Sequence, residues 1–213
     1  MHANTVDRIR DGGVVAILRG VAPEAAGDVA AAVVDGGVTA LEVTADTPRV
    51  AETIESLTAR FDDVLVGAGT VLDSETARAV QLAGAEFIVT PTVDRGVIET
   101  GNRYGTPVAT GAFTPTETVR AYEAGADFVK VFPAATGGPA HVSALGGPLS
   151  QIPLVPTGGV GPANAGAYIE AGAAAVGVGS AIVDDEAVAN EQYETVADNA
   201  RRTVEAVNAA RDQ

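Results

Sequence analysis

The stretch Ala124–Pro133 reads AGADFVKVFP, in which a glycine suited to ending a helix is followed directly by a β-branched and aromatic apolar run. Glycines at Gly37, Gly84 and Gly172 stand in the same position, after an Ala-rich segment and before an apolar run. Glycine is the usual residue at the end of a helix, because it adopts positive φ without steric cost. We therefore predict a chain of repeated helix and strand units, each helix closed by glycine at its C-cap.

Short Val- and Ile-rich runs predict eight strands, each followed by a longer segment with helical spacing. Helices are expected to begin where a capping residue or proline precedes an Ala-rich stretch, at Pro23, Asp73, Thr114 and Gly161-Pro162. Alternating apolar strands and helices predict a parallel sheet covered on both faces. The predicted strands are residues 14–19, 38–43, 64–67, 86–90, 107–110, 127–132, 153–156 and 175–177.

Eight such units favour a closed (β/α)8 barrel, the TIM barrel, over an open doubly wound sheet, which is the alternative fold. No glycine fingerprint of the dinucleotide-binding type follows the first strand, which weakens the alternative. The chain has 213 residues, 46% of them hydrophobic, enough for one domain with a sizeable core. We assign residues 1–213 to a single barrel domain, with one or two C-terminal helices from about residue 185 on its exterior.

The charge composition indicates which kinds of partner the protein would bind poorly. The formal net charge is −15, which argues against a nucleic-acid or anionic-membrane partner. The absence of cysteine excludes disulfides, and two histidines leave no credible zinc cluster. We expect neither a metal nor an organic cofactor, because the Schiff-base chemistry favoured below needs none. No targeting segment or membrane span is recognisable, and we expect a cytoplasmic protein. An acidic chain almost without lysine also favours adaptation to high salt.

Lys130 is the only lysine in the chain, and it lies inside an apolar run. Lysines are normally solvated, and a strand that is buried on both faces disfavours an ammonium group. The alternative is a lysine near the end of a strand whose charged group reaches water. We favour a chemical role, because lysine supplies a nucleophilic amine that forms a Schiff base with a carbonyl, which arginine cannot do.

Glu42 is a second charge inside an apolar run, and its alternative role is an ion pair with a buried arginine such as Arg19. The second and sixth strands of a barrel both project side chains into a shared interior, so Glu42 and Lys130 can meet there. A carboxylate beside a Schiff-base lysine can move the protons lost from the carbinolamine and transferred at C3 of the substrate, directly or through water. We therefore favour a proton-transfer role for Glu42.

Two glycine-containing turns predict an anion site. Thr157-Gly158-Gly159 follows the seventh predicted strand, and Gly179-Ser180 follows the eighth. Active sites of TIM barrels lie at the C-terminal ends of the strands, and phosphate commonly binds after strands seven and eight, against backbone N–H groups. The alternative is that both are simply tight turns.

With these residues the sequence resembles the 2-keto-3-deoxy-6-phosphogluconate aldolase family, class I pyruvate aldolases that include 4-hydroxy-2-oxoglutarate and 2-dehydro-3-deoxy-6-phosphogalactonate aldolases. The resemblance runs from Val14 to about Val183. It rests on five motifs, namely AILRG at 16–20, LEVT at 41–44, GAGTVL at 67–72, KVFPA at 130–134 and PTGGV at 156–160.

The resemblance implies a role for each matching residue. Lys130 would form the Schiff base with pyruvate, and Glu42 would be the general acid and base. Thr70 would help to hold the keto-acid carboxylate, and Pro91 and Phe132 would line the pocket. The remaining matches are Thr157, linked to stereochemical choice, and the phosphate-binding residues Gly158, Gly159 and Ser180.

The resemblance also implies the reaction and the assembly. The substrate would be 2-keto-3-deoxy-6-phosphogluconate or its galactonate epimer, a phosphorylated keto acid cleaved to pyruvate and glyceraldehyde 3-phosphate. The protein would be a homotrimer. Two rival functions stay open: another phosphate-binding barrel enzyme, such as a sugar-phosphate epimerase or a thiamin-phosphate-synthase-like enzyme, and a non-catalytic phosphosugar-binding protein.

One residue departs from the family pattern. Several members carry an arginine shortly after the glutamate strand, directed at the substrate carboxylate, where this chain has Asp46. Another cation is then needed. Arg19 is the first candidate and Arg49 the second, because Arg49 falls at the predicted start of a helix.

Overall fold

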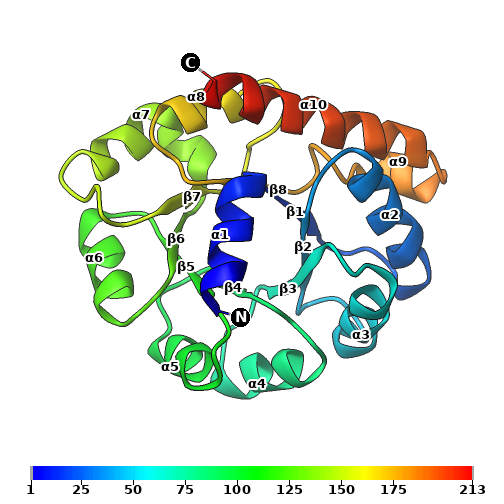
Figure 1. Ribbon diagram of the computed structural model, residues 1–213, viewed down its shortest axis with the longest axis horizontal. Coiled ribbons are helices and arrows are strands. Elements are labelled where there is room, and N and C mark those ends of the chain that lie inside the picture. The colour runs from blue at the N-terminus through cyan, green and yellow to red at the C-terminus, as the bar shows by residue number, and fades with distance from the viewer. Residues whose placement is uncertain (1, 213) are drawn as a thin grey trace.

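The computed structural model describes residues 2–212, which form a ring of eight parallel strands surrounded by helices (Figure 1). The hydrogen-bonded order is β7-β6-β5-β4-β3-β2-β1-β8, and a parallel bridge between Thr157 and Gly177 joins its two ends. The predicted (β/α)8 barrel is confirmed, and the open sheet is excluded. The strands are β1 Val14–Leu18, β2 Ala40–Thr44, β3 Leu65–Gly69, β4 Ile88–Thr90, β5 Val108–Ala112, β6 Phe128–Val131, β7 Leu154–Pro156 and β8 Val176–Val178.

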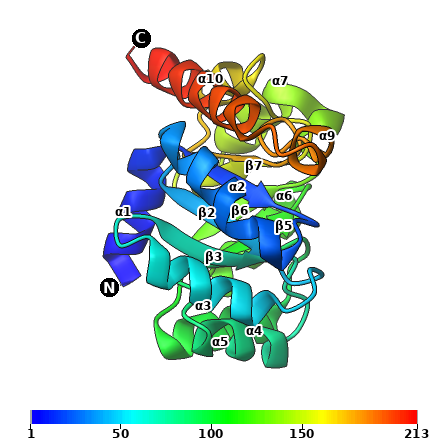
Figure 2. The same ribbon diagram turned by 90° about the vertical axis from the view of Figure 1, so that its right-hand side faces the viewer.

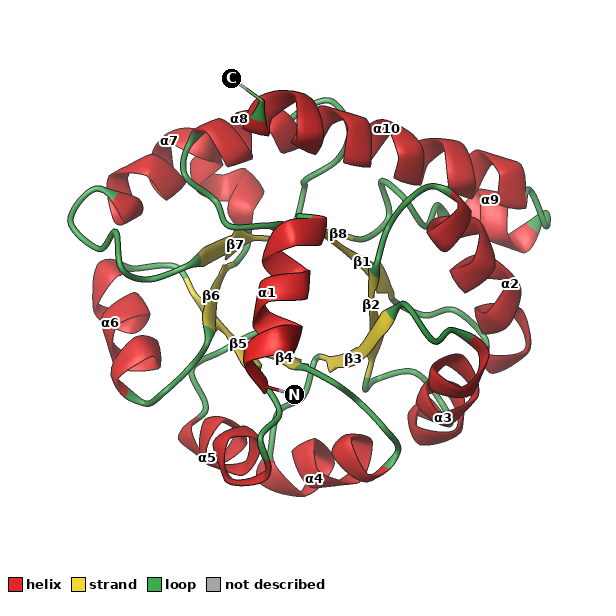
Figure 3. Cartoon of the chain, in the orientation of Figure 1, coloured by secondary structure: helices red, strands yellow, loops and turns green. Residues whose placement is uncertain are grey.

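The helices lie outside the strands, except for α1, which crosses one end of the ring (Figure 3). No helix within residues 2–212 is long and apolar enough to cross a membrane. The helices are α1 His2–Gly12, α2 Pro23–Asp35, α3 Val50–Arg60, α4 Ser74–Leu82, α5 Arg95–Tyr104, α6 Pro115–Glu123, α7 Ala134–Gly146, α8 Ala165–Glu170, α9 Asp185–Ala189 and α10 Tyr193–Arg211.

Most predicted element boundaries agree with the structure. All eight predicted strands are present, and their ends differ from the predictions by at most two residues. Helix α2 begins at Pro23, and α4 and α6 follow the N-caps Asp73 and Thr114 as expected. The Thr114 hydroxyl accepts the Glu117 N–H, and the Glu117 carboxylate accepts the N–H groups of Phe113 and Thr114. These backbone hydrogen bonds lower the pKa of Glu117, and the bond from Phe113 has the largest effect. They also hold the loop after β5 in place.

The predicted start of a helix at Gly161-Pro162 is wrong, because α8 begins at Ala165. The Asn164 side chain accepts the N–H of Gly161 and donates to the carbonyl of Gly159, which holds these residues in a turn. The asparagine side chain bonds to nearby backbone groups here, and these bonds compete with the hydrogen bonds of a helix. The turn extends the loop that follows β7.

The predicted helix-ending glycines are present, with a shift of one position. The C-cap is an alanine at the ends of α4, α6 and α8, and the glycine follows it with positive φ. The φ angles are 101° at Gly84 and 95° at both Gly125 and Gly172. In α2, Gly36 is the C-cap and Gly37 takes the positive φ of 91°. Glycine therefore serves the same purpose one residue later than predicted.

The amino-terminal end of the barrel is sealed by α1, a helix that was not predicted. Ile9 is buried in a cluster with inward-facing side chains at the starts of the strands, among them Val15, Leu65 and Phe128. Figure 2 shows α1 on the opposite side of the strands from α9, which follows β8. The carboxyl ends of the strands are consequently the open end of the barrel.

Candidate active site

Lys130 and Glu42 project into the barrel from opposite walls. Lys130 lies on β6 and Glu42 on β2, and these strands are separated by three others in the sheet order. Side chains alternate between the two faces of a strand, and both residues share the inner face. The Lys130 Nζ atom lies 3.9 Å from Glu42 Oε1, and the two residues are only 4% and 2% exposed. The structure thus brings together the two residues on which the sequence interpretation depends.

The Glu42 carboxylate has an unused acceptor. Its Oε1 atom is buried and accepts no hydrogen bond from any residue in the described part of the chain. The distance to Lys130 Nζ suits an ion pair but is too long for a hydrogen bond. Buried polar atoms without a partner are unusual and costly, and they are characteristic of functional sites. This oxygen is available to a hydroxyl group or water that enters the space beside the amine.

Inward-facing glycines create the room around the pair. A Cβ atom on Gly69 of β3 would lie 1.8 Å from Glu42 Oε1. A Cβ on Gly111 of β5 would lie 2.2 Å from the Pro91 backbone, and one on Gly177 of β8 would lie 2.3 Å from Thr157 Oγ1. Such distances are far below van der Waals contact. Glycine at these positions therefore leaves the space that Glu42, the Pro91 backbone and Thr157 occupy, and a side chain there would displace them.

We expect Gly69→Ala to lower kcat by roughly a hundredfold, since a catalytic group displaced by about 1 Å can cost that much. The new methyl group would push the Glu42 carboxylate away from its place 3.9 Å from Lys130 Nζ. Steady-state kinetics and a thermal unfolding curve would separate lost catalysis from lost folding. Gly146→Ala is the matched control, because a Cβ at that helical position meets nothing within 4 Å. Wild-type kcat in Gly69→Ala would contradict this role.

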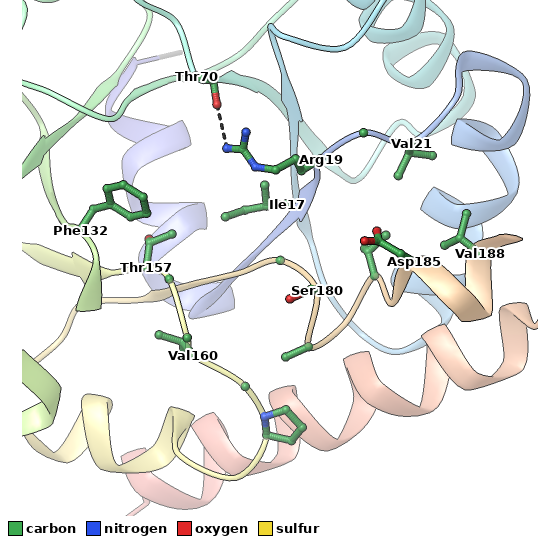
Figure 4. Close-up of a pocket in the computed structure, with 18 of the residues that line it drawn as sticks. Ile17, Arg19, Val21, Thr70, Phe132, Thr157, Val160, Ser180, Asp185 and Val188 are labelled. Atoms are coloured by element: carbon green, nitrogen blue, oxygen red, sulfur yellow. Dashed lines mark hydrogen bonds between the residues drawn. The ribbon is translucent and has the colours of Figure 1, made fainter. Parts of the chain in front are cut away.

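Above the pair, a cavity of about 1060 Å³ opens at the carboxyl ends of the strands (Figure 4). Lys130 forms part of its lining, whereas Glu42 lines a separate space of about 20 Å³ beneath, together with Lys130 and Thr157. Phe132 stands beside the amine, with the Lys130 Nζ atom 5.4 Å from its ring centroid. The other predicted site residues that line the large cavity are Arg19, Thr70, Pro91, Thr157, Gly158, Gly159, Gly179 and Ser180.

Arg19 is held at the mouth of the cavity by two partners. It donates to Asp46 Oδ2 at 2.8 Å and to Thr70 Oγ1 at 2.9 Å, as the dashed line in Figure 4 shows for Thr70. The proposed alternative, an ion pair between Arg19 and Glu42, is wrong, because the carboxylate partner of Arg19 is Asp46. Arg49 pairs instead with Glu24 and does not line the cavity. Asp46, the residue that departs from the family pattern, therefore positions Arg19, the first candidate for the cation that binds the substrate carboxylate.

The two predicted glycine turns lie on the same wall of the cavity. Gly158 and Gly159 both have positive φ, 91° and 77°, so a side chain at either would strain the turn. The N–H groups of Gly158, Gly159 and Ser180 donate no hydrogen bond to any of residues 2–212. Clustered free backbone N–H groups form a concave donor surface suited to an anion.

The sequence did not predict the outer wall of the cavity. Asp185 and Val188 of α9 and Arg202 of α10 line it beyond Ser180. These helices follow the last strand, and no motif in the sequence connects them with the barrel interior. Among the described residues, no group of three or more histidine, aspartate or glutamate side chains could hold a metal ion.

Comparisons with known proteins show which family this chain resembles. The sequence model of the KDPG and KHG aldolase family matches residues 6–199. The chain is 39% identical over 168 residues to the 2-dehydro-3-deoxy-6-phosphogalactonate aldolase of Escherichia coli K12, covering 78% of this chain and 82% of the relative. It is 36% identical over 180 residues to the 2-dehydro-3-deoxy-phosphogluconate aldolase of Treponema pallidum, covering 84% and 86%.

A solved structure of similar fold contains a reaction intermediate. The KDPG aldolase of Legionella pneumophila, with pyruvate captured as a covalent carbinolamine, superposes with a TM-score of 0.86 at 30% identity. The match covers 93% of this chain and 97% of the other. The similarity thus extends over the whole barrel, including the strands that carry Lys130 and Glu42.

Proposed function

This chain belongs to the KDPG and KHG aldolase family, and from that premise we infer that it cleaves 2-keto-3-deoxy-6-phosphogluconate or its galactonate epimer to pyruvate and glyceraldehyde 3-phosphate. It is an aldehyde-lyase of the aldolase type. One observation supports the proposed mechanism above others: a buried lysine amine that lines a large cavity lies 3.9 Å from a buried carboxylate oxygen beneath that cavity.

We propose that the Lys130 amine, once deprotonated, attacks C2 of the keto acid. The carbinolamine loses its hydroxyl group as water and leaves a protonated imine. Removal of the C4 hydroxyl proton then breaks the C3–C4 bond, the electron pair moves into the imine to give an enamine, and the aldehyde departs. Protonation at C3 and hydrolysis by water release pyruvate and the free amine. We assign the transfer of these protons to Glu42, and the proposal is supported by its Oε1 atom, which has no hydrogen-bond partner in residues 2–212.

The remaining cavity residues divide between the two ends of the substrate. We propose that Arg19, oriented by Asp46 and Thr70, binds the keto-acid carboxylate. Thr157 would lie beside the reacting carbons, because it lines the same small space as Lys130 and Glu42, and the phosphate would lie at the far end. The phosphate would bind to the free N–H groups of Gly158, Gly159 and Ser180, together with the adjoining Gly179. The apolar walls would be formed by Pro91 and Phe132.

Trapping with borohydride tests the proposed function. Incubation with pyruvate and borohydride should leave a stable adduct and abolish activity, because reduction converts the imine to a secondary amine. Lys130 is the only lysine, so the adduct should map to a single peptide, and mass spectrometry distinguishes it from a reaction at the N-terminal amine. A protein that binds phosphosugars but forms no adduct would instead support one of the two rival functions, with Lys130 as a clamp.

Substrate preference and assembly are further parts of the proposal. The two curated relatives act, by name, on different epimers, so kinetics on both phosphorylated epimers and on the unphosphorylated acid should define the preference. We propose a cytoplasmic homotrimer, supported by the family resemblance, and test its mass by sedimentation. Adaptation to salt, supported by the net charge of −15, predicts activity retained in molar potassium chloride.

A further inference from the structure

The wall of the cavity beyond Ser180 carries two charged side chains that the mechanism above leaves unused. Asp185 is the first residue of α9, and Arg202 lies midway along α10. Both line the cavity that contains Lys130 and the two glycine turns. Figure 4 shows Asp185 on the same side of the cavity as Ser180, with Val188 beyond it.

Arg202 is unlike the other cations of the cavity in having no partner. The guanidinium of Arg19 is held by Asp46 and Thr70, and the Lys130 ammonium faces Glu42. Arg202 forms no hydrogen bond or ion pair with any described residue, although its neighbour Arg201 is paired with Asp198. The Arg202 side chain is therefore free to bind an anion that enters the cavity.

The proposed substrate needs a cation at this end. Its phosphate carries up to two negative charges, and the glycine turns offer only neutral donors. Lys130 and Arg19 are committed to the keto-acid end. The chain carries a net charge of −15, which opposes the approach of any anion. An arginine is well suited to phosphate, because its planar fork can donate two hydrogen bonds at once.

We propose that Arg202 binds the substrate phosphate from the outer wall of the cavity and that Asp185 weakens this binding from the same wall. The inference rests on the proposed function and adds a specificity-determining residue to it. Arg202 would favour phosphorylated over unphosphorylated keto acids. The Asp185 carboxylate accepts no hydrogen bond from the described residues, so its charge is not neutralised by a neighbour.

Steady-state kinetics of Arg202→Gln on the phosphorylated substrate and on its unphosphorylated analogue test the proposal. A charged hydrogen bond to phosphate at a partly exposed site corresponds to roughly a tenfold effect. We expect KM for the phosphorylated substrate to rise about tenfold with kcat nearly unchanged, and both constants for the analogue to stay as in the wild type. An equal loss on both substrates, or no change in KM, would overturn the proposal.

Two further variants sharpen the test. Arg201→Gln removes an adjacent arginine of the same helix that does not line the cavity, and it should leave KM unchanged. Asp185→Asn should act in the opposite direction, lowering KM for the phosphorylated substrate only. A rise in KM in Arg201→Gln equal to that in Arg202→Gln would show a general charge effect and defeat the proposal.

Trapping with pyruvate separates this proposal from the function on which it rests. Pyruvate carries no phosphate, so Arg202→Gln should form the borohydride adduct as fully as the wild type, which also shows that the variant is folded. If the wild type forms no adduct, the proposed function is wrong. If it does, and Arg202→Gln binds the phosphorylated substrate normally, only the role of Arg202 is wrong.

Discussion

Replacing Lys130 with methionine should reduce cleavage by roughly four orders of magnitude or more, because no other side chain in the protein can form an imine. Methionine keeps much of the volume of the lysine side chain without its amine. The activity should be measured with an assay for released pyruvate, and borohydride trapping should give no adduct. Normal turnover in this variant would end the Schiff-base proposal.

The Lys130→Met variant should also lose stability, because Lys130 and Glu42 form a buried ion pair. Removing one member of such a pair typically costs about 3–5 kcal/mol, since the other charge is left without compensation. We therefore expect Lys130→Met to unfold at lower temperature than the wild type. The double variant Lys130→Met with Glu42→Gln removes both charges and should recover most of that stability while staying inactive. This pattern would separate the chemical role of Lys130 from its structural one.

The second largest effect is expected for Glu42→Gln, a substitution that keeps the shape of the side chain and removes its ability to take up a proton. General acid and base catalysis by one group contributes about 10²–10⁴-fold, and kcat should fall within that range. The direct measurement is the exchange of pyruvate methyl protons in deuterated water, followed by NMR, because it reports proton transfer at C3. We expect exchange to slow in parallel with cleavage.

Glu55→Gln is the matched control, since Glu55 is exposed on α3, a helix outside the ring of strands. It should exchange pyruvate protons as the wild type does. If Glu42→Gln exchanged protons at the wild-type rate, another group would have to be the proton carrier. If it formed no adduct at all, Glu42 would act in imine formation rather than at C3.

The arrangement of strands was predictable because it follows from local signals. Apolar runs and helix-ending glycines recur along the chain, and a sequence with eight such units has few alternatives to a closed barrel. The meeting of Glu42 and Lys130 followed from the same logic, since strand position and side-chain alternation fix which residues face the interior. The chemical roles of the two residues stay predictions until the variants are measured.

What could not be predicted depends on contacts distant in sequence or on competing local bonds. Arg19 follows β1 and pairs with Asp46, which follows the neighbouring strand β2, and nothing in either motif indicates that contact. The start of α8 was wrong because Asn164 holds the preceding turn with its side chain. Arg202 lies on a helix outside the barrel, and its cavity-facing position depends on how α10 packs across the neighbouring helices.

The helix α1 has a consequence for the order of events. Because α1 closes the amino-terminal end of the barrel, the cavity opens at the carboxyl ends of the strands, and the buried amine lies at its base. A molecule joined to Lys130 is then the lower occupant, and its partner fragment sits between it and the outside. The aldehyde must depart first and the three-carbon acid last, while in synthesis the acid must load before the aldehyde. An excess of aldehyde that occupies the cavity above Lys130 should therefore slow synthesis, because it blocks the entry of pyruvate.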